Sequence, residues 1–320
     1  MTDASRTDAV HPRFDGFDAH YTSAIEPWIV KQEDRRKLFL KLAALAIVVT
    51  IVLIAALQLL YWGVIGDAFH IAAILFAVPA VMGGAVCWAI VWLFRFSIKQ
   101  YLVPKVCQFA GLAFDARPTS FPFNLFDDAD FLPNHDRKVW EDGISGTHEN
   151  VEFSLVEAKL QTRQSTDTGS DSWRTKWRGM FFLLEFPKPF QGRTIVTREK
   201  GAMGKLFSGQ PADPVHLEDP RFEKLFEAYS TDQVEARYLL TPTFMERVVA
   251  LAAMVGKDSP EFAFVDNRLG IAVKSSKNRF EGGSILTPMQ DRKRVDDLVL
   301  ELSLIFHIID ALQINVKSHS

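Results

Sequence analysis

Three residues near the C-terminus combine the side-chain types of a nucleophilic catalyst. Ser303, His307 and Asp310 stand at positions i, i+4 and i+7 of an expected helix, which places a hydroxyl, an imidazole and a carboxylate on one stripe. Nucleophilic catalysis also needs a nucleophile on a sharp turn and donors that face the developing oxyanion. Three groups on one helix do not provide these. We therefore interpret the stripe as a polar seam, hydrogen-bonded locally, and assign no catalytic residue.

A glycine-rich loop at 197–217 has part of the composition of a phosphate-binding loop. In a P-loop a Ser or Thr follows the lysine so that its hydroxyl reaches magnesium, whereas Leu206 follows Lys205 here. The glycines also lack the P-loop spacing; they are Gly201, Gly204 and Gly209. We expect no cofactor here and interpret the stretch as a mobile loop, with contact between its basic residues and anionic lipid headgroups as the alternative.

Aromatic and basic residues alternate from Trp173 to Arg178, as they do in platforms for single-stranded nucleic acid. In an extended strand, however, Trp173 and Trp177 point to one face, and Arg174, Lys176 and Arg178 point to the other. Stacking and phosphate contacts would then not meet on one nucleic-acid strand. We expect a solvated basic strand face and no nucleic-acid partner.

The residues that ligate metals show no motif in the sequence. The acidic cluster Asp127, Asp128 and Asp130 lacks the regular oxygen spacing and the glycine of a calcium loop. The two cysteines of the chain, Cys87 and Cys107, do not indicate a disulfide or a thiolate site. The eight histidines are scattered without paired ligand spacing. We therefore expect no metal site and no cofactor.

Composition limits the class of protein that carries these residues. The chain has 320 residues, of which 48% are apolar, so it can bury a core. Its 36 Lys and Arg against 39 Asp and Glu leave a net charge of −3, which gives no general attraction to nucleic acid. The apolar residues are unevenly distributed, with a marked concentration at 42–94.

Two uncharged runs predict a transmembrane helical hairpin. They are Leu42–Gly66, of 25 residues, and Ile71–Phe94, of 24 residues, separated by four residues. A helix of the first length covers about 37 Å, enough for a hydrocarbon core of about 30 Å. Neither run contains Asp, Glu, Lys or Arg, which makes a transport path between them a poor interpretation.

The flanking charges predict the orientation of this hairpin. Eight basic residues lie close to the outer ends of the two runs: Lys31, Arg35, Arg36, Lys37, Lys41, Arg95, Lys99 and Lys105. The connecting loop 67–70 carries no Lys or Arg. Because basic flanks stay on the cytoplasmic side, we expect both termini in the cytoplasm.

Turn and periodicity signals divide the remaining chain. We expect a cytosolic tail at 1–37 with a local break at Glu26-Pro27, spans at 38–66 and 71–94, an interfacial helix and linker at 95–114, and one domain at 115–320. In that domain, 121–133 suggests an irregular linker. Strands are expected at 151–155, 173–186 and 193–197, and a hairpin at 261–273.

Helices follow the strands. The capping pair Ser230 and Gln233 predicts a helix at 231–240, and Thr241 with Pro242 predicts another at 242–255. Thr287 and Pro288 predict the start of a 25-residue helix that ends near Leu312 and forms the spine of the domain. Strands first and helices later predict an α+β domain with an antiparallel sheet of at least five strands.

The block Leu217–Pro242, LEDPRFEKLFEAYSTDQVEARYLLTP, resembles a bacterial two-span membrane-protein family of unknown function, domain of unknown function 3137. The matching positions are Phe222, Phe226, Tyr229, Asp232, Gln233, Ala236, Arg237, Tyr238, Thr241 and Pro242. The resemblance implies a location in the bacterial inner (cytoplasmic) membrane and no particular activity. We expect Arg237 to be a buried structural arginine near Asp232, with a ligand contact as the alternative.

Taken together, these features favour a non-enzymatic, membrane-anchored binding or scaffold module. Its expected partners are the lipid bilayer and either a protein or an anionic lipid headgroup at the cytoplasmic face. The alternative is a membrane-tethered hydrolase, for which His307 and Asp310 are the best available acid–base pair. An open cleft in which His307 meets an acid from another element would favour the hydrolase, and a filled interior would favour the module.

Overall fold

The computed structural model describes residues 10–64, 69–129, 132–165, 171–186, 189–198, 206–207, 210–255, 260–275, 279–281 and 283–312. The chain divides into two compact units. The helical unit comprises 15–106 and 280–299. The sheet unit comprises the residues up to 14, 107–279 and those from 300 onward. Each unit is described by itself.

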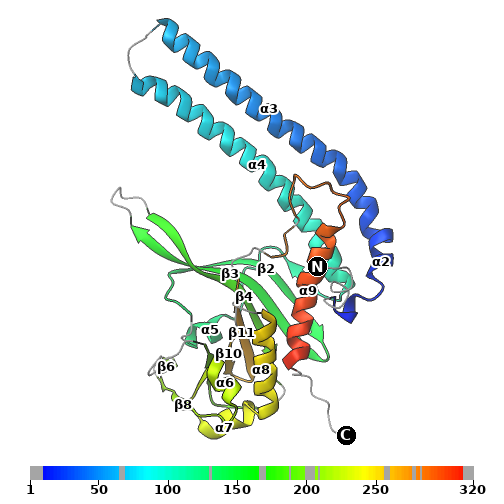
Figure 1. Ribbon diagram of the computed structural model, residues 1–320, viewed down its shortest axis with the longest axis vertical. Coiled ribbons are helices and arrows are strands. Elements are labelled where there is room, and N and C mark those ends of the chain that lie inside the picture. The colour runs from blue at the N-terminus through cyan, green and yellow to red at the C-terminus, as the bar shows by residue number, and fades with distance from the viewer. Residues whose placement is uncertain are drawn as a thin grey trace. The chain divides into compact units, whose positions relative to one another are not determined.

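Two long helices dominate the helical unit (Figure 1): α3 (Glu26–Val64) and α4 (Phe69–Phe109). α4 contains the second uncharged run, α3 contains the first as far as Val64, and each is long and apolar enough to span a membrane. Their most hydrophobic windows of 18 residues are 0% buried against other parts of the structure. The expectation of two long apolar helices is confirmed.

The chain before α3 is helical as well, so the break predicted at Glu26-Pro27 is wrong. α2 (Phe17–His20) leads into a π-helical turn, η2 (Tyr21–Ile25), and directly into α3. A proline in a helix crowds the carbonyl four residues earlier, here Ser23, and the wider π-helical turn contains that residue. The interfacial helix predicted from 95 is likewise not separate, because α4 runs on to Phe109 with Pro79 and Pro104 inside it.

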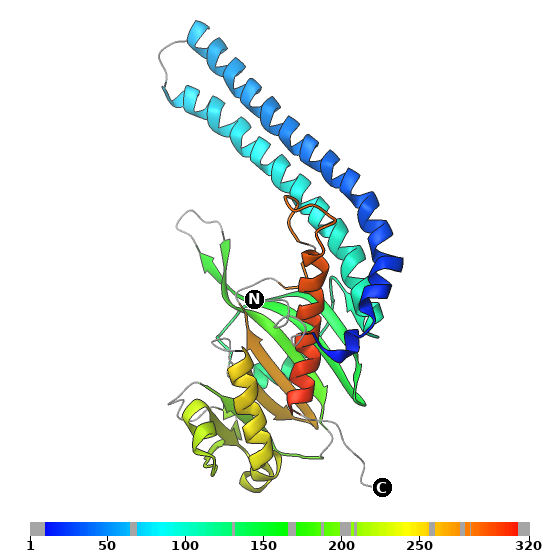
Figure 2. The ribbon, with the colours of Figure 1, turned by 45° about the vertical axis from the view of Figure 1, so that its right-hand side comes forward.

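The sheet unit is built on nine antiparallel strands in the order β1-β2-β3-β4-β11-β10-β5-β9-β8. This sheet with helices packed on it confirms the α+β class (Figure 2). The strands are β1 (Ala113–Asp115), β2 (Arg137–His148), β3 (Val151–Ser165), β4 (Asp171–Glu185), β5 (Thr194–Thr197), β8 (Asp213–Val215), β9 (Glu227–Ser230), β10 (Pro260–Val265) and β11 (Arg268–Lys274). A separate pair consists of β6 (Leu206–Phe207) and β7 (Gln210–Pro211).

Two tight turns fix the register of this sheet. Glu149 and Asn150 join β2 to β3, and Asp266 and Asn267 join β10 to β11, all with positive φ between 49° and 64°. Left-handed residues at both central positions match the twist of the strands that they connect. The second hairpin confirms the one predicted at 261–273.

Helices cover both faces of the central strands. On one face, Phe306 of α9 (Lys293–Leu312) approaches Phe153, and Phe244 of α8 (Pro242–Val255) approaches Phe264. On the other face lies α5 (Asn124–Asp128), a short helix within the predicted irregular linker, whose Phe126 packs on Phe181. Both faces of β10 and β11 are therefore buried, which explains their nearly continuous apolar sequences.

Two helix starts differ from the predictions. α7 (Gln233–Leu239) is capped by Asp232, whose side chain accepts from the N–H groups of Val234 and Glu235, whereas Ser230 ends β9. α9 begins at Lys293 rather than at Pro288. The segment before it is bound elsewhere, since the Met289 N–H donates to Glu33 of α3, and this tertiary contact replaces the predicted first helical turns. The remaining short helix is α6 (Pro220–Leu225).

The first prediction tests the role of α9 as the spine of the sheet unit. Phe306 is fully buried and its ring contacts those of His11, Phe14, His148 and Phe153. Phe306→Ala should therefore lower the free energy of unfolding by about 3–5 kcal/mol, because it leaves a large cavity. Denaturant unfolding of the detergent-solubilised chain measures this. Val234→Ala, at an exposed position, should change it by less than about 0.5 kcal/mol, and equal effects of the two variants would contradict the role of α9.

Candidate functional site

A cluster of two histidines and one aspartate joins three distant segments of the sheet unit. The Nε2 atom of His11 lies 2.7 Å from Oδ2 of Asp310, and the Nε2 atom of His148 lies 2.6 Å from Oδ1. His11 precedes the first helical turn, His148 ends β2, and Asp310 lies in the last turns of α9. We call this set the His–Asp–His clamp.

Both histidines of the clamp are nearly inaccessible to solvent, while its aspartate is not. His11 and His148 are 7% and 5% exposed, and the Asp310 side chain is 43% exposed. Burial alone would raise the pKa of Asp310, but the hydrogen bonds from His11 and His148 outweigh it and the pKa is lowered. A charged carboxylate therefore accepts from two imidazoles at the edge of the sheet unit.

The other members of the predicted stripe surround the clamp. Ser303 is fully buried, and its Oγ accepts a hydrogen bond of 3.1 Å from the backbone N–H of His11. The ring of His307 lies edge-on to that of His11, with centroids 5.1 Å apart. The prediction of local hydrogen bonds is wrong for Asp310, whose partners are about 160 and 300 positions away, and Ser303 likewise binds a residue about 290 positions away.

The hydrogen bonds of His11 fix its tautomer. Its Nδ1 accepts from the backbone N–H of Arg13 at 3.0 Å, so in the neutral ring the proton is on Nε2 and is donated to Asp310. The Nδ1 atom of His148 is buried and has no hydrogen-bond partner among the described residues. For His148, as for His11, the tautomer with its proton on Nε2 fits this geometry, because it leaves no N–H unpaired at the buried Nδ1.

Two imidazoles and a carboxylate are also ligands for zinc and other transition metals, and the donor atoms lie within 4.8 Å of one another. A metal-bound histidine normally donates its second ring N–H to an acceptor. At His11 that second nitrogen accepts from Arg13, so coordination through Nε2 would break this bond and set two N–H groups against each other. The donor set therefore fits a hydrogen-bonded clamp better than a metal centre.

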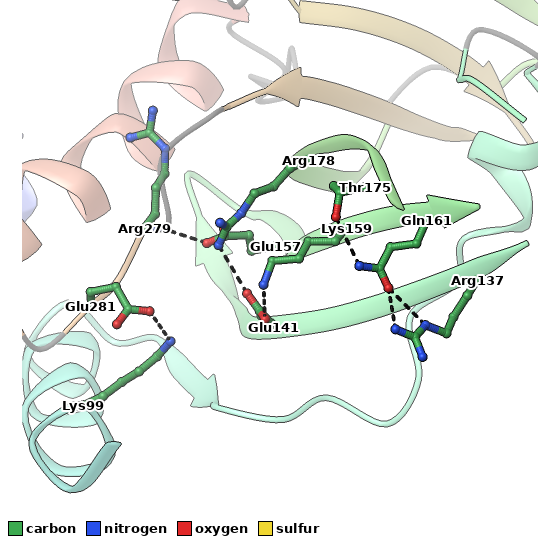
Figure 3. Close-up of polar contacts among 10 residues, drawn as sticks. All are labelled: Lys99, Arg137, Glu141, Glu157, Lys159, Gln161, Thr175, Arg178, Arg279 and Glu281. Atoms are coloured by element: carbon green, nitrogen blue, oxygen red, sulfur yellow. Dashed lines mark hydrogen bonds and ion pairs between the residues drawn. The ribbon is translucent and has the colours of Figure 1, made fainter. Parts of the chain in front are cut away.

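A second polar cluster lies on β2, β3 and β4 (Figure 3). Glu157 is buried, and its carboxylate accepts from Nε of Arg178 at 2.9 Å and from the backbone N–H of Arg279 at 3.0 Å. Burial raises the pKa of Glu157 despite these bonds. Glu141 pairs with Lys159 and with Arg178, at 2.5 and 3.3 Å. The basic face predicted for this strand is thus partly neutralised, and Arg178 is not simply solvated.

The hollows in the described part of the sheet unit include the following two. The larger, about 460 Å³, is an open depression beside Ser145, Glu152, Glu185 and Arg268. The smaller, about 260 Å³, is lined by Phe222, Phe226 and Tyr229 from the block that carries the family resemblance, with His216, Glu223 and Glu227 among its polar residues. We call the smaller one the aromatic groove. Neither hollow is lined by the residues of the clamp.

A hydrogen bond orders the wall of the aromatic groove. The hydroxyl of Tyr229 donates to Glu227 at 2.8 Å, and burial together with this carboxylate raises the pKa of Tyr229 to about 12. Phe222 and Phe226 pack with ring centroids 5.4 Å apart. Arg237, by contrast, is exposed and donates to the Gln233 carbonyl one turn earlier, so the expectation that it is buried near Asp232 is wrong.

The remaining sequence candidates have mixed outcomes. Asp127 forms ion pairs with Lys138 and with His135, which accounts for one member of the acidic cluster, while Asp130 lies outside the described residues. The glycines of the loop 197–217 also lie outside them, as does Lys205. His11 and His148 were missed because no spacing in the sequence links positions 11, 148 and 310; only tertiary structure brings them together.

Comparison with known proteins places the C-terminal part of the chain in a family. Residues 175–314 match the family model described as "Protein of unknown function (DUF3137)". The match covers less than half of the chain, and it confirms the resemblance by identifying this region as a domain of that family. No curated protein matches the chain.

Among solved structures, a mycobacterial protein matches, the trehalose monomycolate transport factor A, TtfA. It is 11% identical, and the match covers 68% of this chain and 97% of that one with a TM-score of 0.33. Likeness at this level supports no inference about function.

The second prediction concerns the clamp and pH. Burial lowers the pKa of His11 below 6.5; the hydrogen bond to Asp310 opposes this, and the charges of His148 and His307 add to it. The folded state then binds fewer protons than the unfolded state, so stability should fall as pH drops below about 6.5, until the folded-state pKa is reached. Thermal unfolding of the full chain between about pH 7.5 and about pH 5.5 measures this.

The matched variant is His11→Gln, whose side-chain amide can still donate to Asp310 but does not titrate. Its stability should depend less on pH over the same interval than that of the unmodified chain. Equal pH dependence in the two proteins would mean that His11 is not responsible.

Proposed function

We propose that this protein is a non-enzymatic binding or scaffold module anchored in the bacterial inner membrane. The observation that carries the proposal is the contrast between its two units. One consists largely of exposed apolar helices, and the other is a packed α+β domain with an aromatic groove on its surface. The first suits a bilayer, and the second suits a partner at the cytoplasmic face.

The anchor is proposed with the boundaries expected from the sequence. Residues 38–66 and 71–94 form the spans, 1–37 and 95–114 flank them on the cytoplasmic side, and 115–320 form the cytosolic domain. Support comes from the eight basic residues beside the outer ends of the runs and from a connecting loop without Lys or Arg. The same charges allow contact with anionic headgroups.

The aromatic groove is the proposed binding surface. The almost fully buried Phe222, Phe226 and Tyr229 form its apolar floor, while Glu223 and Glu227 make its polar side acidic. A volume of about 260 Å³ holds one or two side chains rather than a cofactor. The chemistry fits a protein segment that presents a basic residue beside an apolar one, and no nucleic acid.

The hydrolase alternative has weaker support. A serine nucleophile must reach its substrate, whereas Ser303 is fully buried and its hydroxyl is bonded to the backbone of His11. Asp310 meets histidines from other elements, but both of its oxygens serve those buried rings. The His–Asp–His clamp holds the N-terminal segment, β2 and α9 together. Its histidines and aspartate therefore have a structural role.

The third prediction tests topology. Single cysteines introduced at the exposed positions Asp15 and Lys293 should react with a membrane-impermeant maleimide only after the inner membrane is opened, because both lie on the cytoplasmic side. A cysteine in the loop 67–70 should react in intact spheroplasts. The reverse pattern would overturn the proposed orientation and the cytoplasmic location of the domain.

The fourth prediction tests the groove. A photoreactive phenylalanine analogue at Glu223 should give discrete cross-linked products in native membranes, because this position lines the groove. The same analogue at the neighbouring exposed Lys224 is the matched control and should give fewer. Glu227→Lys, which reverses a charge in the groove, should abolish the products from position 223. Equal cross-linking at both positions, or products indifferent to Glu227→Lys, would contradict the assignment.

A further inference from the structure

The segment 283–289 of the helical unit presents an apolar side chain in an unusual setting. Leu286 is 78% exposed, while its neighbours Ile285 and Met289 are buried. One exposed leucine is ordinary on a soluble protein. Here, however, the segment lies against α3 and α4 close to the uncharged runs, as its contacts below establish (Figure 1).

Polar contacts hold the segment to α3 before the start of the first uncharged run. The carbonyl of Ile285 accepts from Arg36 at 3.0 Å, and the N–H of Met289 donates to Glu33 at 2.9 Å. Glu33 and Arg36 are themselves a buried ion pair, with oxygen and nitrogen 2.7 Å apart, and the pKa of Glu33 is lowered to about 2, mainly by its hydrogen bonds with Arg36. The attachment to α3 is therefore made by charged groups fixed to each other.

The attachment to α4 is made by Glu281. Its carboxylate lies 3.1 Å from Arg95. It also lies 3.2 Å from Lys99 (Figure 3). Arg95 directly follows Phe94, the last residue of the second uncharged run. On α3, Arg36 lies six positions before Leu42, which is about 9 Å along a helix.

These positions determine the depth of the segment if the two runs span a bilayer. The headgroup region adds about 5–7 Å on each side of the hydrocarbon core. Contacts that begin at the end of one run and about 9 Å from the other therefore place 281–289 between the end of the hydrocarbon core and the outer edge of the headgroups, which the more distant contact exceeds by only about 2–4 Å. This step rests on the proposed function.

Protein groups already pair with several backbone groups of the turn. The carbonyls of Ser284 and Thr287 accept from Arg294 at 2.8 and 3.1 Å, and the N–H of Leu286 donates to Oγ of Ser284 at 3.1 Å. Together with the Arg36 bond to Ile285, these contacts replace water at the tip. Backbone groups paired in this way depend less on water, which suits a position beside the hydrocarbon core.

Gly283 makes this arrangement possible. It has φ of +82°, and a Cβ added to it would lie 2.3 Å from the guanidinium of Arg294. A side chain at this position would displace the arginine that serves the two carbonyls. The turn is thus built around Arg294, with an apolar side chain left outside.

We propose that residues 284–288 form an interfacial finger, in which Leu286 enters the headgroup region of the membrane that holds α3 and α4. The exposed Pro288, which has no N–H, lies beside it on the same turn. The partly exposed Lys37 and Arg95 provide matching charge for lipid phosphates. The finger fixes how deeply the two helices are immersed at the cytoplasmic side.

Depth-dependent fluorescence quenching of the full-length protein in phosphatidylethanolamine–phosphatidylglycerol vesicles tests this. A polarity-sensitive fluorophore is attached to cysteine in the variants Leu286→Cys, Gln290→Cys and Val81→Cys, each with Cys87→Ala. Cys107 can remain, because burial raises the pKa of its thiol to about 12 and makes it unreactive. Gln290 is the exposed control in the same segment, and Val81 reports on the second uncharged run.

The label at position 286 should be shifted to the blue, quenched by nitroxides near the lipid headgroups and protected from aqueous iodide, whereas the label at 290 should be quenched by iodide. The label at 81 should be quenched by nitroxides deep in the acyl chains. If 81 behaves as expected but 286 matches 290, the finger is wrong and the span stands. If 81 is not quenched from the acyl chains, the proposed span fails and the finger fails with it.

Discussion

The exposed apolar surface of α3 and α4 is the constraint on which the rest of the structure depends. Side chains such as Val52 and Val81 project from helices that no other described element covers along their most hydrophobic windows. Such a surface is far larger than soluble monomers leave in contact with water, so it must be covered. A bilayer would cover it and would hold the basic flanks at the membrane surface. The charged contacts of Glu33, Arg36 and Arg95 then occur where the apolar runs end.

Outside these runs, buried polar groups decide how distant segments meet. In the sheet unit, Asp310 joins the N-terminal segment to the end of β2 through two imidazoles, and Glu157 joins β3 to the backbone after β11. Each is a carboxylate whose loss would leave several donors unpaired, which costs more than the bonds themselves contribute. Such contacts specify a packing arrangement without requiring a catalytic role for the residues that make them.

Local patterns in the sequence predicted the elements, and tertiary contacts decided the rest. The uncharged runs, the Asp266-Asn267 hairpin and the helix at 242–255 follow from length, turn chemistry and capping, which are local properties. The predicted start of α9 was wrong because Glu33 and Arg36 bind the segment that carries Thr287 and Pro288. The candidate site was only half predictable. Its members on α9 share a helical stripe, but nothing local connects them with His11 and His148, and the exposure of Arg237 depends on packing around α7.

Extraction of native membranes with alkaline carbonate measures directly whether the two apolar helices anchor this protein. High pH and the opening of vesicles release proteins held by surface charge, whereas helices inside the hydrocarbon core stay in the membrane. The account predicts that the full chain stays in the pellet and is released by detergent, and that a chain lacking residues 38–94 appears in the supernatant. Release of the full chain by carbonate alone would contradict the account, because α3 and α4 would then have to be covered by something other than lipid.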